Sequence, residues 1–260
     1  MKKQKKIELL DHGYVQLVDR WGSEEAIIEA ARMSTDKGFL GWGPRHGEAC
    51  ELYETDEPKA DPDESCCTSL PGDEKLLSFL YRNKHATPFE MAGLTIETQA
   101  PIFVFREWHR HRIPFGYNEL SARYTPMPDV NYVPSFERCI LGRNPTTNKQ
   151  AGAIKDAVEL TDEAALMWRT TVEEFYQSAE RLYQRGLHAG LPKELARIVV
   201  PVGRYSRMRA TGNLRGWLAF MTLRTASGAQ WEIRQYAETV GELVKQQFPR
   251  TYDLWLEGQA

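Results

Sequence analysis

Apolar residues recur at helical spacing along much of the chain. Leu76, Leu77, Leu80 and Tyr81 are an example, because steps of three and four residues place side chains on one face of a helix. Ser23, a favoured N-cap residue, marks a helix start and is followed by two glutamates in the first turn. The pattern predicts helices at residues 23–33, 73–84, from Pro101 onward, 153–187, 193–199, 213–226 and 229–247.

Strand signals are weaker. Residues 94–98 alternate between apolar and polar side chains, as a half-buried strand does. We expect an irregular loop after Pro114 and Gly116, an extended segment at residues 120–124, and a further loop over the Pro-, Asn- and Thr-rich residues 126–150. Neither an internal repeat nor a linker divides the chain, so we predict a single elaborated domain of the α+β class over residues 1–260.

One segment, residues 36–72, breaks every periodic pattern with Gly, Pro and acidic clusters, and we expect it to be a surface insertion. It contains His46, Cys50, Cys66 and Cys67, which could in principle form a zinc site. Adjacent cysteines are poor metal spacing, and the sequence has no Cys-x-x-Cys pair. Free thiols are therefore the favoured interpretation, and no metal site is predicted.

Composition and charge narrow the function. The chain of 260 residues is 42% hydrophobic and 27% charged, as globular proteins are. Its net charge of -3 gives no general attraction for nucleic acid, so any anion binding must be local. Apolar runs such as residues 198–202 are far shorter than the ~20 residues of a membrane helix, and no apolar signal core follows the N-terminal lysines. We therefore expect a cytoplasmic protein that neither spans a membrane nor binds nucleic acid.

Residues 106–124 concentrate arginine, histidine and glutamate among aromatic side chains. Guanidinium groups bind phosphate through paired hydrogen bonds, so such a cluster is a natural site for a nucleotide phosphate. The alternative is a solvated helix with ion pairs between successive turns. Apolar residues are interleaved with the charges, and this favours a partly buried cleft; they are Trp108, Ile113, Phe115, Tyr117 and Leu120.

The geometry of this cluster depends on where the helix ends. If residues 101–112 stay helical, Arg110 and Arg112 point about 200° apart, since each residue turns a helix by about 100°. Either the helix ends before Arg112, or the two arginines bind different ligands, one of which could belong to a site shared with another subunit. Glu107 lies one turn before Arg110 and could orient it.

Four blocks of the sequence resemble the flavin-dependent thymidylate synthases. Arg110-His111-Arg112, followed by Ser121, Arg123 and Tyr124, is similar to the signature of that family. The other blocks stand in the family's order, and the whole resemblance spans roughly residues 20 to 250. These blocks are residues 85–90, 195–201, and 213–215 together with 223–234.

The resemblance implies a homotetramer with a central mixed or antiparallel sheet flanked by helices, and with sites shared between subunits. It implies that FAD is the cofactor, that methylenetetrahydrofolate donates a one-carbon unit to dUMP, and that NADPH reduces the flavin. The matching flavin contacts are His85, Thr87, Glu90, Arg110, His111, Arg112, Asn118, Glu119, Asn213 and Arg215. The matching dUMP contacts are Glu107, Arg110, Glu119, Ser121, Arg123, Arg197 and Arg224.

Arg224 is the first catalytic candidate. It shares a helical face with Trp217, Phe220 and Met221, so a cation ends an apolar stripe. There it could sit against a uracil ring and stabilise negative charge as the base becomes nucleophilic. The alternative is an arginine that extends past the apolar surface into water.

Ser121 is the second catalytic candidate. In an extended segment it would share one face with Glu119 and Arg123. A serine nucleophile needs a base, usually histidine, and none is adjacent, so substrate binding is the favoured role. His111 could act as an acid or a base because it titrates near neutrality, but contact with flavin is favoured.

The sequence departs from the family pattern in three respects. The spacing from Arg112 to Ser121 is one residue longer than in its commonest form, and Glu107 stands where glutamine is frequent. Ala219 and Gly228 stand where many relatives have asparagine and histidine near the flavin. The first two departures leave open a related enzyme with a hydroxymethylated or deoxycytidylate-derived product. A nucleic-acid-binding module built on the arginines is a more distant alternative, because the net charge is negative.

Overall fold

The computed structural model describes residues 5–43, 45–46, 69–70, 72–141 and 159–259. Its internal contacts divide the chain into two compact units. The sheet unit comprises Met1–Asp19, Leu94–Gly212 and Gly216–Leu243, and the helical unit comprises Arg20–Gly93, Asn213–Arg215 and Val244–Ala260. No helix within the described ranges combines the length and apolarity that a bilayer span requires.

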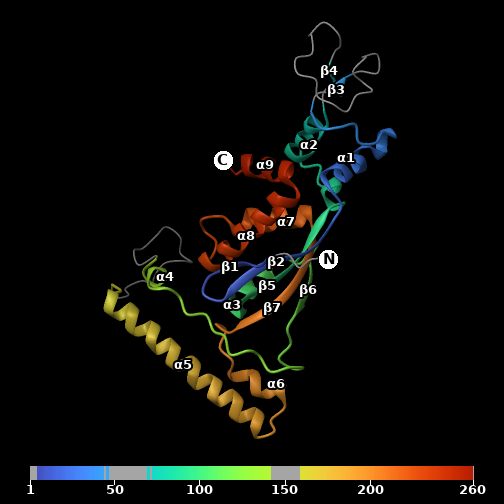
Figure 1. The fold of residues 1–260 in the computed structure, drawn as a ribbon. Helices are drawn as coiled ribbons and strands as arrows, with labels where there is room; N and C mark the ends of the chain where they lie inside the picture. Colours follow the sequence, from blue (N-terminus) through green and yellow to red (C-terminus); the bar gives the residue numbers. More distant parts are fainter. Residues whose placement is uncertain (1–4, 44, 47–68, 71, 142–158, 260) are drawn as a thin grey trace. The chain divides into compact units, whose positions relative to one another are not determined.

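A five-stranded antiparallel sheet organises the sheet unit (Figure 1). Its strands run in the order β1 (Ile7–Leu9), β2 (Gly13–Trp21), β5 (Gly93–Pro101), β7 (Tyr205–Asn213) and β6 (Gly116–Glu119). The sheet and its helices confirm the expected α+β class, and β5 confirms and extends the strand predicted at residues 94–98. The assignment of the whole chain to one domain stays a prediction.

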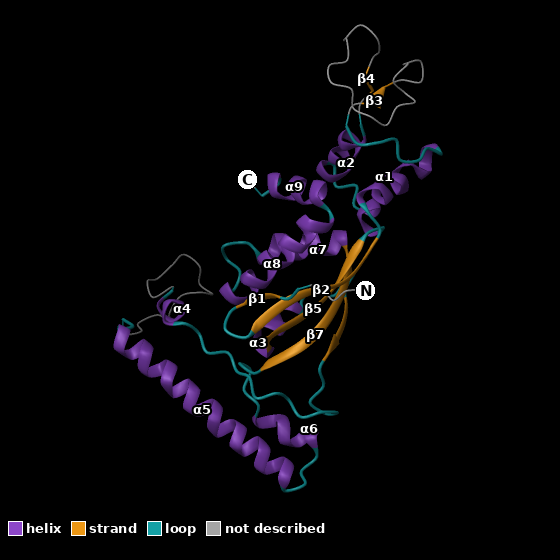
Figure 2. Ribbon diagram, in the orientation of Figure 1, coloured by secondary structure: helices purple, strands orange, loops and turns teal. Residues whose placement is uncertain are grey.

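The two faces of the sheet differ in chemistry. Ile96 and Ala210 point to a buried face, whereas Glu97 and Arg209 point to the other face and form an ion pair with 3.3 Å between Nε and Oε2. This alternation is typical of an antiparallel sheet that is covered on one side only. The covering helices are α3 (Ile102–Trp108), α7 (Leu214–Arg224) and α8 (Trp231–Gln247), and Figure 2 shows α7 and α8 as a layer beside the strands.

Aromatic packing holds these helices to one another and to the sheet. The ring of Trp108 stacks on Phe220 at 4.8 Å and meets Tyr236 edge-on at 5.9 Å, so α3, α7 and α8 share one core. Trp217 Nε1 donates a hydrogen bond of 3.1 Å to the carbonyl of Leu94, and Tyr236 donates one of 2.7 Å to the carbonyl of Gln99. Trp217 and Tyr236 therefore bury apolar area and also anchor their polar atoms on β5.

A long helix, α5 (Asp162–His188), forms a separate part of the sheet unit together with α4 (Phe136–Ile140), α6 (Lys193–Ala196) and the 3-10 turn η3 (Arg197–Val199). It confirms the predicted helix from Asp162 onward, and residues 153–158 of that prediction lie outside the described residues. The fully buried Arg204 ties α5 to the sheet, because its Nη2 donates to Glu180 Oε2 at 2.6 Å. Several large apolar residues of α5 are exposed, including Met167, Trp168 and Phe175.

The helical unit contains α1 (Glu24–Arg32), the 3-10 turn η1 (Met33–Thr35), α2 (Asp73–Arg82), the 3-10 turn η2 (Thr87–Glu90) and α9 (Pro249–Glu257). Ser23 caps α1 as predicted, since its Oγ accepts from the N–H of Ala26 at 3.3 Å. The buried carboxylate of Glu24 accepts a 2.6 Å hydrogen bond from the N–H of Thr251, which joins α1 to α9.

The predicted insertion at residues 36–72 is paired at its base. Two short antiparallel strands, β3 (Arg45–His46) and β4 (Ser69–Leu70), bring its two ends together. Cys50, Cys66 and Cys67, which the sequence offered as thiols or zinc ligands, lie outside the described residues. Among the residues that the structure does describe, no three His, Cys, Asp or Glu side chains gather as a metal site.

Two local predictions are wrong. The extended segment is Gly116–Glu119 rather than residues 120–124, because Gly116 to Glu119 pair with β7. Residues 121–125 instead form a turn, in which the N–H groups of Tyr124 and Thr125 donate to the carbonyl of Ser121. The predicted loop at residues 126–150 contains α4, which Ser135 caps through a hydrogen bond from the N–H of Arg138.

The buried ion pair between Arg204 and Glu180 gives a stability prediction. Replacing Glu180 with alanine should lower the free energy of unfolding by about 2–3 kcal/mol, since the buried guanidinium loses its closest anion and keeps the exposed Asp129 carboxylate at 3.4 Å. Chemical denaturation measures the loss. Glu173→Ala is the matched control on the same helix, because its partner Arg169 is exposed and 3.8 Å away. Equal losses in the two variants would contradict the assignment.

Candidate functional site

Three of the predicted site residues meet in the sheet unit. The guanidinium of Arg224, the last residue of α7, donates from Nη1 to Glu107 Oε2 at 2.7 Å and from Nη2 to the backbone carbonyl of Glu107 at 2.8 Å. Its Nε donates to His111 Nε2 at 2.9 Å. We call these three residues the Arg224 cluster. Glu107 therefore orients Arg224 and not Arg110, which helical spacing had suggested.

The end of α3 makes this arrangement available. The helix ends at Trp108, so no N–H of a following helical turn donates to the carbonyl of Glu107. This carbonyl can therefore accept a hydrogen bond from a side chain. The apolar stripe of α7 is buried at Trp217 and Phe220, which fixes the position of Arg224. Arg224 is itself only 9% exposed, so the alternative of an arginine that extends into water is wrong.

Burial keeps the imidazole of His111 neutral. Burial first, and the nearby Arg224 guanidinium second, lower the pKa of His111 from 6.5 to about 4, although the Glu107 carboxylate opposes this shift. At neutral pH the ring therefore accepts the hydrogen bond from Arg224 at Nε2 and holds its proton on Nδ1. The cluster thus combines one cation, one carboxylate and one neutral imidazole.

The segment between Arg112 and Ser121 packs next to this cluster. The ring of Phe115 packs against Trp217 at 4.7 Å and stacks with Tyr117 at 5.8 Å. A Cβ atom at Gly212 would lie 2.5 Å from that ring, so only glycine leaves room for it. Tyr117 in turn donates a 2.6 Å hydrogen bond to the carbonyl of His111, which links the packed segment to the cluster.

A second group of predicted residues lies around the turn that follows β6. Ser121 Oγ accepts from the N–H of Arg123 at 3.3 Å, and the Arg123 guanidinium lies 3.4 Å from Glu194 of α6. Lys193 also donates to the carbonyl of Tyr124 at 3.0 Å, so α6 and the turn are neighbours. Arg197 follows on the same short helical stretch, at the start of η3. We expected Glu119, Ser121 and Arg123 to share one face of an extended segment. This expectation is wrong, because residues 121–125 form a turn.

The remaining sheet-unit candidates are spread over the end of α3 and over β6. Arg110 and Arg112 are exposed and lie after the end of α3 at Trp108. Of the two alternatives for these arginines, the structure therefore has the one in which the helix ends before them. Asn118 and Glu119 are exposed on β6, where they pair with Arg209 and Met208 of β7. Successive strand residues point to opposite faces, so Asn118 and Glu119 face opposite sides of the sheet.

The other flavin candidates lie in the helical unit. Arg215 Nη1 donates to Glu90 Oε1 at 2.5 Å, so two of them form an ion pair. His85 and Thr87 line a pocket of about 400 Å³ together with apolar residues of α1 and α2. Asn213 is the last residue of β7. The departures at Ala219 and Gly228 are both exposed.

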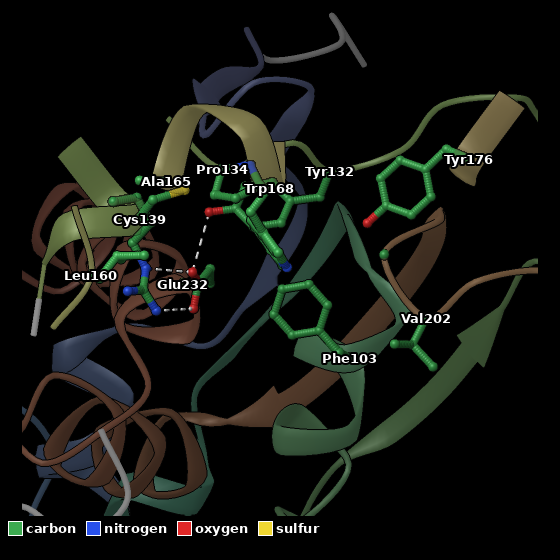
Figure 3. A pocket seen from close by; sticks show the side chains of 12 residues that line it. Phe103, Tyr132, Pro134, Cys139, Leu160, Ala165, Trp168, Tyr176, Val202 and Glu232 are labelled. Atoms are coloured by element: carbon green, nitrogen blue, oxygen red, sulfur yellow. Dashed lines mark hydrogen bonds and ion pairs between the residues drawn. The ribbon is translucent and has the colours of Figure 1, made fainter. Parts of the chain in front are cut away.

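A pocket of about 500 Å³ in the sheet unit contains none of the predicted site residues (Figure 3). Aromatic side chains line it, among them Phe103, Tyr132, Trp168 and Tyr176. Its charged groups pair with each other: Arg138 donates to the buried Glu232 at 2.6 Å. No sequence pattern linked these residues.

The same pocket holds Cys139. Burial raises the pKa of its thiol, as is typical of an unreactive cysteine. Tyr132 donates to Glu232 at 3.2 Å and Gln230 donates to it at 3.0 Å, so with Arg138 the carboxylate has hydrogen-bond donors from three side chains. Glu232 therefore joins α8 to α4 and the segment before it.

Known proteins identify the family. The family model described as thymidylate synthase complementing protein matches residues 16–250. A flavin-dependent thymidylate synthase of Thermosipho africanus is 33% identical over 250 residues, covering 96% of this chain and 93% of the relative. The chain belongs to the flavin-dependent thymidylate synthase family. A flavin-dependent thymidylate synthase of Thermus thermophilus is 35% identical over 245 residues, covering 94% of this chain and 75% of that relative.

Solved structures agree with this membership of the flavin-dependent thymidylate synthase family. The UMP/dUMP methylase PolB from Streptomyces cacaoi bound with 5-Br UMP aligns with a TM-score of 0.73 at 28% identity, over 96% of both chains. The same methylase bound with 5-Br dUMP aligns with a TM-score of 0.71 at 31% identity, over 96% of this chain and 97% of that one. The resemblance seen in the four sequence blocks is confirmed.

The packing of Phe115 on Gly212 gives a prediction. Gly212→Ala should lower the free energy of unfolding by about 1–3 kcal/mol, because the new methyl group must displace a packed ring. Gly38→Ala is the control, since a Cβ at Gly38 meets nothing within 4 Å. Adding Phe115→Ala to Gly212→Ala should recover part of the packing strain, and losses that simply add would contradict this contact between Phe115 and Gly212.

The neutral state of His111 gives a pH prediction. The unfolded chain takes up a proton at this position below about pH 6.5, whereas the folded chain does so only near pH 4, so stability is lost as the pH falls between these values. Denaturation at pH 7 and pH 5 should show a larger loss in the wild type than in His111→Gln. His188→Gln, at an exposed position on α5, should keep the wild-type loss. An unchanged pH dependence in His111→Gln would contradict the assignment.

Proposed function

We propose that the protein methylates dUMP to dTMP, with methylenetetrahydrofolate as the one-carbon donor and NADPH as the reductant through FAD. The observation that supports this most is the Arg224 cluster. It places a buried cation and a carboxylate from two helices in contact, within a chain that belongs to the flavin-dependent thymidylate synthase family. The PolB structures support a uridine nucleotide as substrate, since they hold 5-Br UMP and 5-Br dUMP.

In this proposal two groups of residues bind dUMP. Arg224 contacts the uracil ring and stabilises negative charge as C5 becomes nucleophilic, an effect that is strong where water is excluded. Arg110, Arg123 and Arg197 are exposed guanidiniums suited to the phosphate, and Ser121 adds a hydroxyl. The Ser121 hydroxyl accepts from the Arg123 N–H, and within the described part of the chain it bonds no histidine or carboxylate that could act as its base, so we assign it to binding.

The donor set also fits FAD. Arg112 in the sheet unit and Arg215 in the helical unit are each an exposed guanidinium suited to a phosphate oxygen, and His85 and Thr87 line a pocket of the helical unit. When bound, FAD supplies the hydride that converts the transferred one-carbon unit to a methyl group. His111 would donate from Nδ1 to a flavin or substrate oxygen, since Arg224 occupies its Nε2. Glu90, Asn118, Glu119 and Asn213 complete the proposed contacts.

A homotetramer with shared sites belongs to the same proposal. The exposed apolar side chains of α5, among them Met167, Trp168 and Phe175, form a surface that a second copy could cover. Light scattering of the purified protein tests this assembly. A monomer would remove the proposed sharing of sites between subunits.

One observation favours a broader substrate range. PolB is named as a methylase of both UMP and dUMP, and it aligns over nearly the whole chain. UMP is therefore a second candidate substrate. Mass spectrometry of the products formed from dUMP, UMP and dCMP separates the two uridine nucleotides from each other and from the deoxycytidylate alternative.

Arg224→Ala tests the proposed function. Turnover of dUMP should fall by about 10²–10³, the usual effect of removing a group that stabilises transition-state charge. The flavin absorbance of the purified protein should persist, and NADPH oxidation with dTMP formation gives the rate. Arg209→Ala, on the exposed face of the sheet, should leave turnover near the wild-type rate. Full activity in Arg224→Ala would remove this residue from the mechanism.

A further inference from the structure

Glu107 contributes a charge to the Arg224 cluster that the other two contacts cannot supply. The guanidinium already has two neutral acceptors, the carbonyl of Glu107 at 2.8 Å and the imidazole of His111 at 2.9 Å. These two hydrogen bonds fix the direction of the Arg224 side chain. The carboxylate at 2.7 Å adds a third bond and a full negative charge.

The ionised groups of the cluster therefore balance. Glu107 belongs to α3, the neutral His111 lies in the segment after α3, and Arg224 belongs to α7. Among the described residues that bond the Arg224 guanidinium, Glu107 is the one anion. The Glu107 side chain is 40% exposed and that of Arg224 only 11%, so a ligand that arrives from solvent meets the carboxylate together with the cation.

We infer that Glu107 is a positioning residue whose carboxylate offsets the charge of Arg224 and so sets the pH at which a bound uracil ring loses its N3 proton. This inference rests on the proposed function. Loss of the N3 proton to water leaves a negative charge spread over the ring, which makes C5 more nucleophilic. A cation within about 4–6 Å lowers the pKa of an acid by about 1–3 units, and a cation paired with a carboxylate lowers it less.

Glu107→Gln separates charge from position. The amide oxygen can still accept from Arg224 Nη1, and the backbone carbonyl and His111 are unchanged, so the guanidinium keeps its direction. Only the negative charge is lost. Bound uracil should then lose its N3 proton at a pH about one unit lower than in the wild type.

The experiment uses the FAD-loaded protein with dUMP that carries nitrogen-15 at N3. The chemical shift of this nitrogen, followed against pH, reports the protonation of the bound ring directly. In Glu107→Gln the midpoint should move down by about one unit, and the pH profile of kcat should move with it, while KM changes less than threefold. Glu97→Gln removes the carboxylate of the ion pair with Arg209 on the exposed sheet face and should move neither midpoint nor profile.

The outcomes are distinct. An N3 midpoint that is the same in the wild type and Glu107→Gln overturns the inference, even if both enzymes make dTMP. A tenfold loss of dUMP affinity without a shifted midpoint also overturns it, because the carboxylate would then act in binding dUMP and not on the protonation of its ring. If the wild-type protein neither binds nor methylates dUMP, the proposed function fails and the inference fails with it.

Discussion

The central constraint on the proposed site is that a buried guanidinium must have acceptors, since an unpaired buried charge is very costly. Arg224 meets this requirement with atoms of Glu107 and His111 alone. Glu107 lies in the last turn of α3 and His111 lies three residues after it, so the hydrogen bonds that Arg224 needs also fix α7 against α3. The stacking of Trp108 on Phe220 provides the apolar side of the same contact.

The early end of α3 makes this bonding possible. In a helix that continued to Arg112, the carbonyl of Glu107 would accept the N–H of His111. Instead the N–H of His111 bonds to the carbonyl of Trp108 at 3.0 Å, and the Glu107 carbonyl receives Arg224. Because α3 ends at Trp108, Arg110 and Arg112 are not helical residues. A local feature of the backbone thus decides which cations are buried and which stay exposed.

Local signals predicted the helices well, and non-local contacts explain the errors. Ser23 and the spacing of apolar residues in α2 act within one or two turns, so the sequence reveals α1 and α2 directly. The strand at residues 116–119 exists because it pairs with β7, with partners that run from Gly116–Thr211, 95 residues apart, to Glu119–Met208, 89 residues apart. No pattern within residues 113–125 contains that information. Strands β1, β2 and β7 and helices α4 and α9 were not predicted, although β7 alternates strictly between buried and exposed residues from Ser206 to Gly212.

The departures from the family signature show the same division between local and distant effects. The longer spacing that the sequence indicates before Ser121 falls in a segment that is held by packing, because Phe115 fits against Gly212 and Trp217. Glu107 is a change of charge, and packing cannot absorb it. The backbone carbonyl and the neutral imidazole that also bond Arg224 carry no net charge, so among its bonding partners in the described residues Glu107 alone offsets the charge of the guanidinium. Sequence comparison could name both departures, but only the bonded geometry shows that the second one places a carboxylate 2.7 Å from the guanidinium of Arg224.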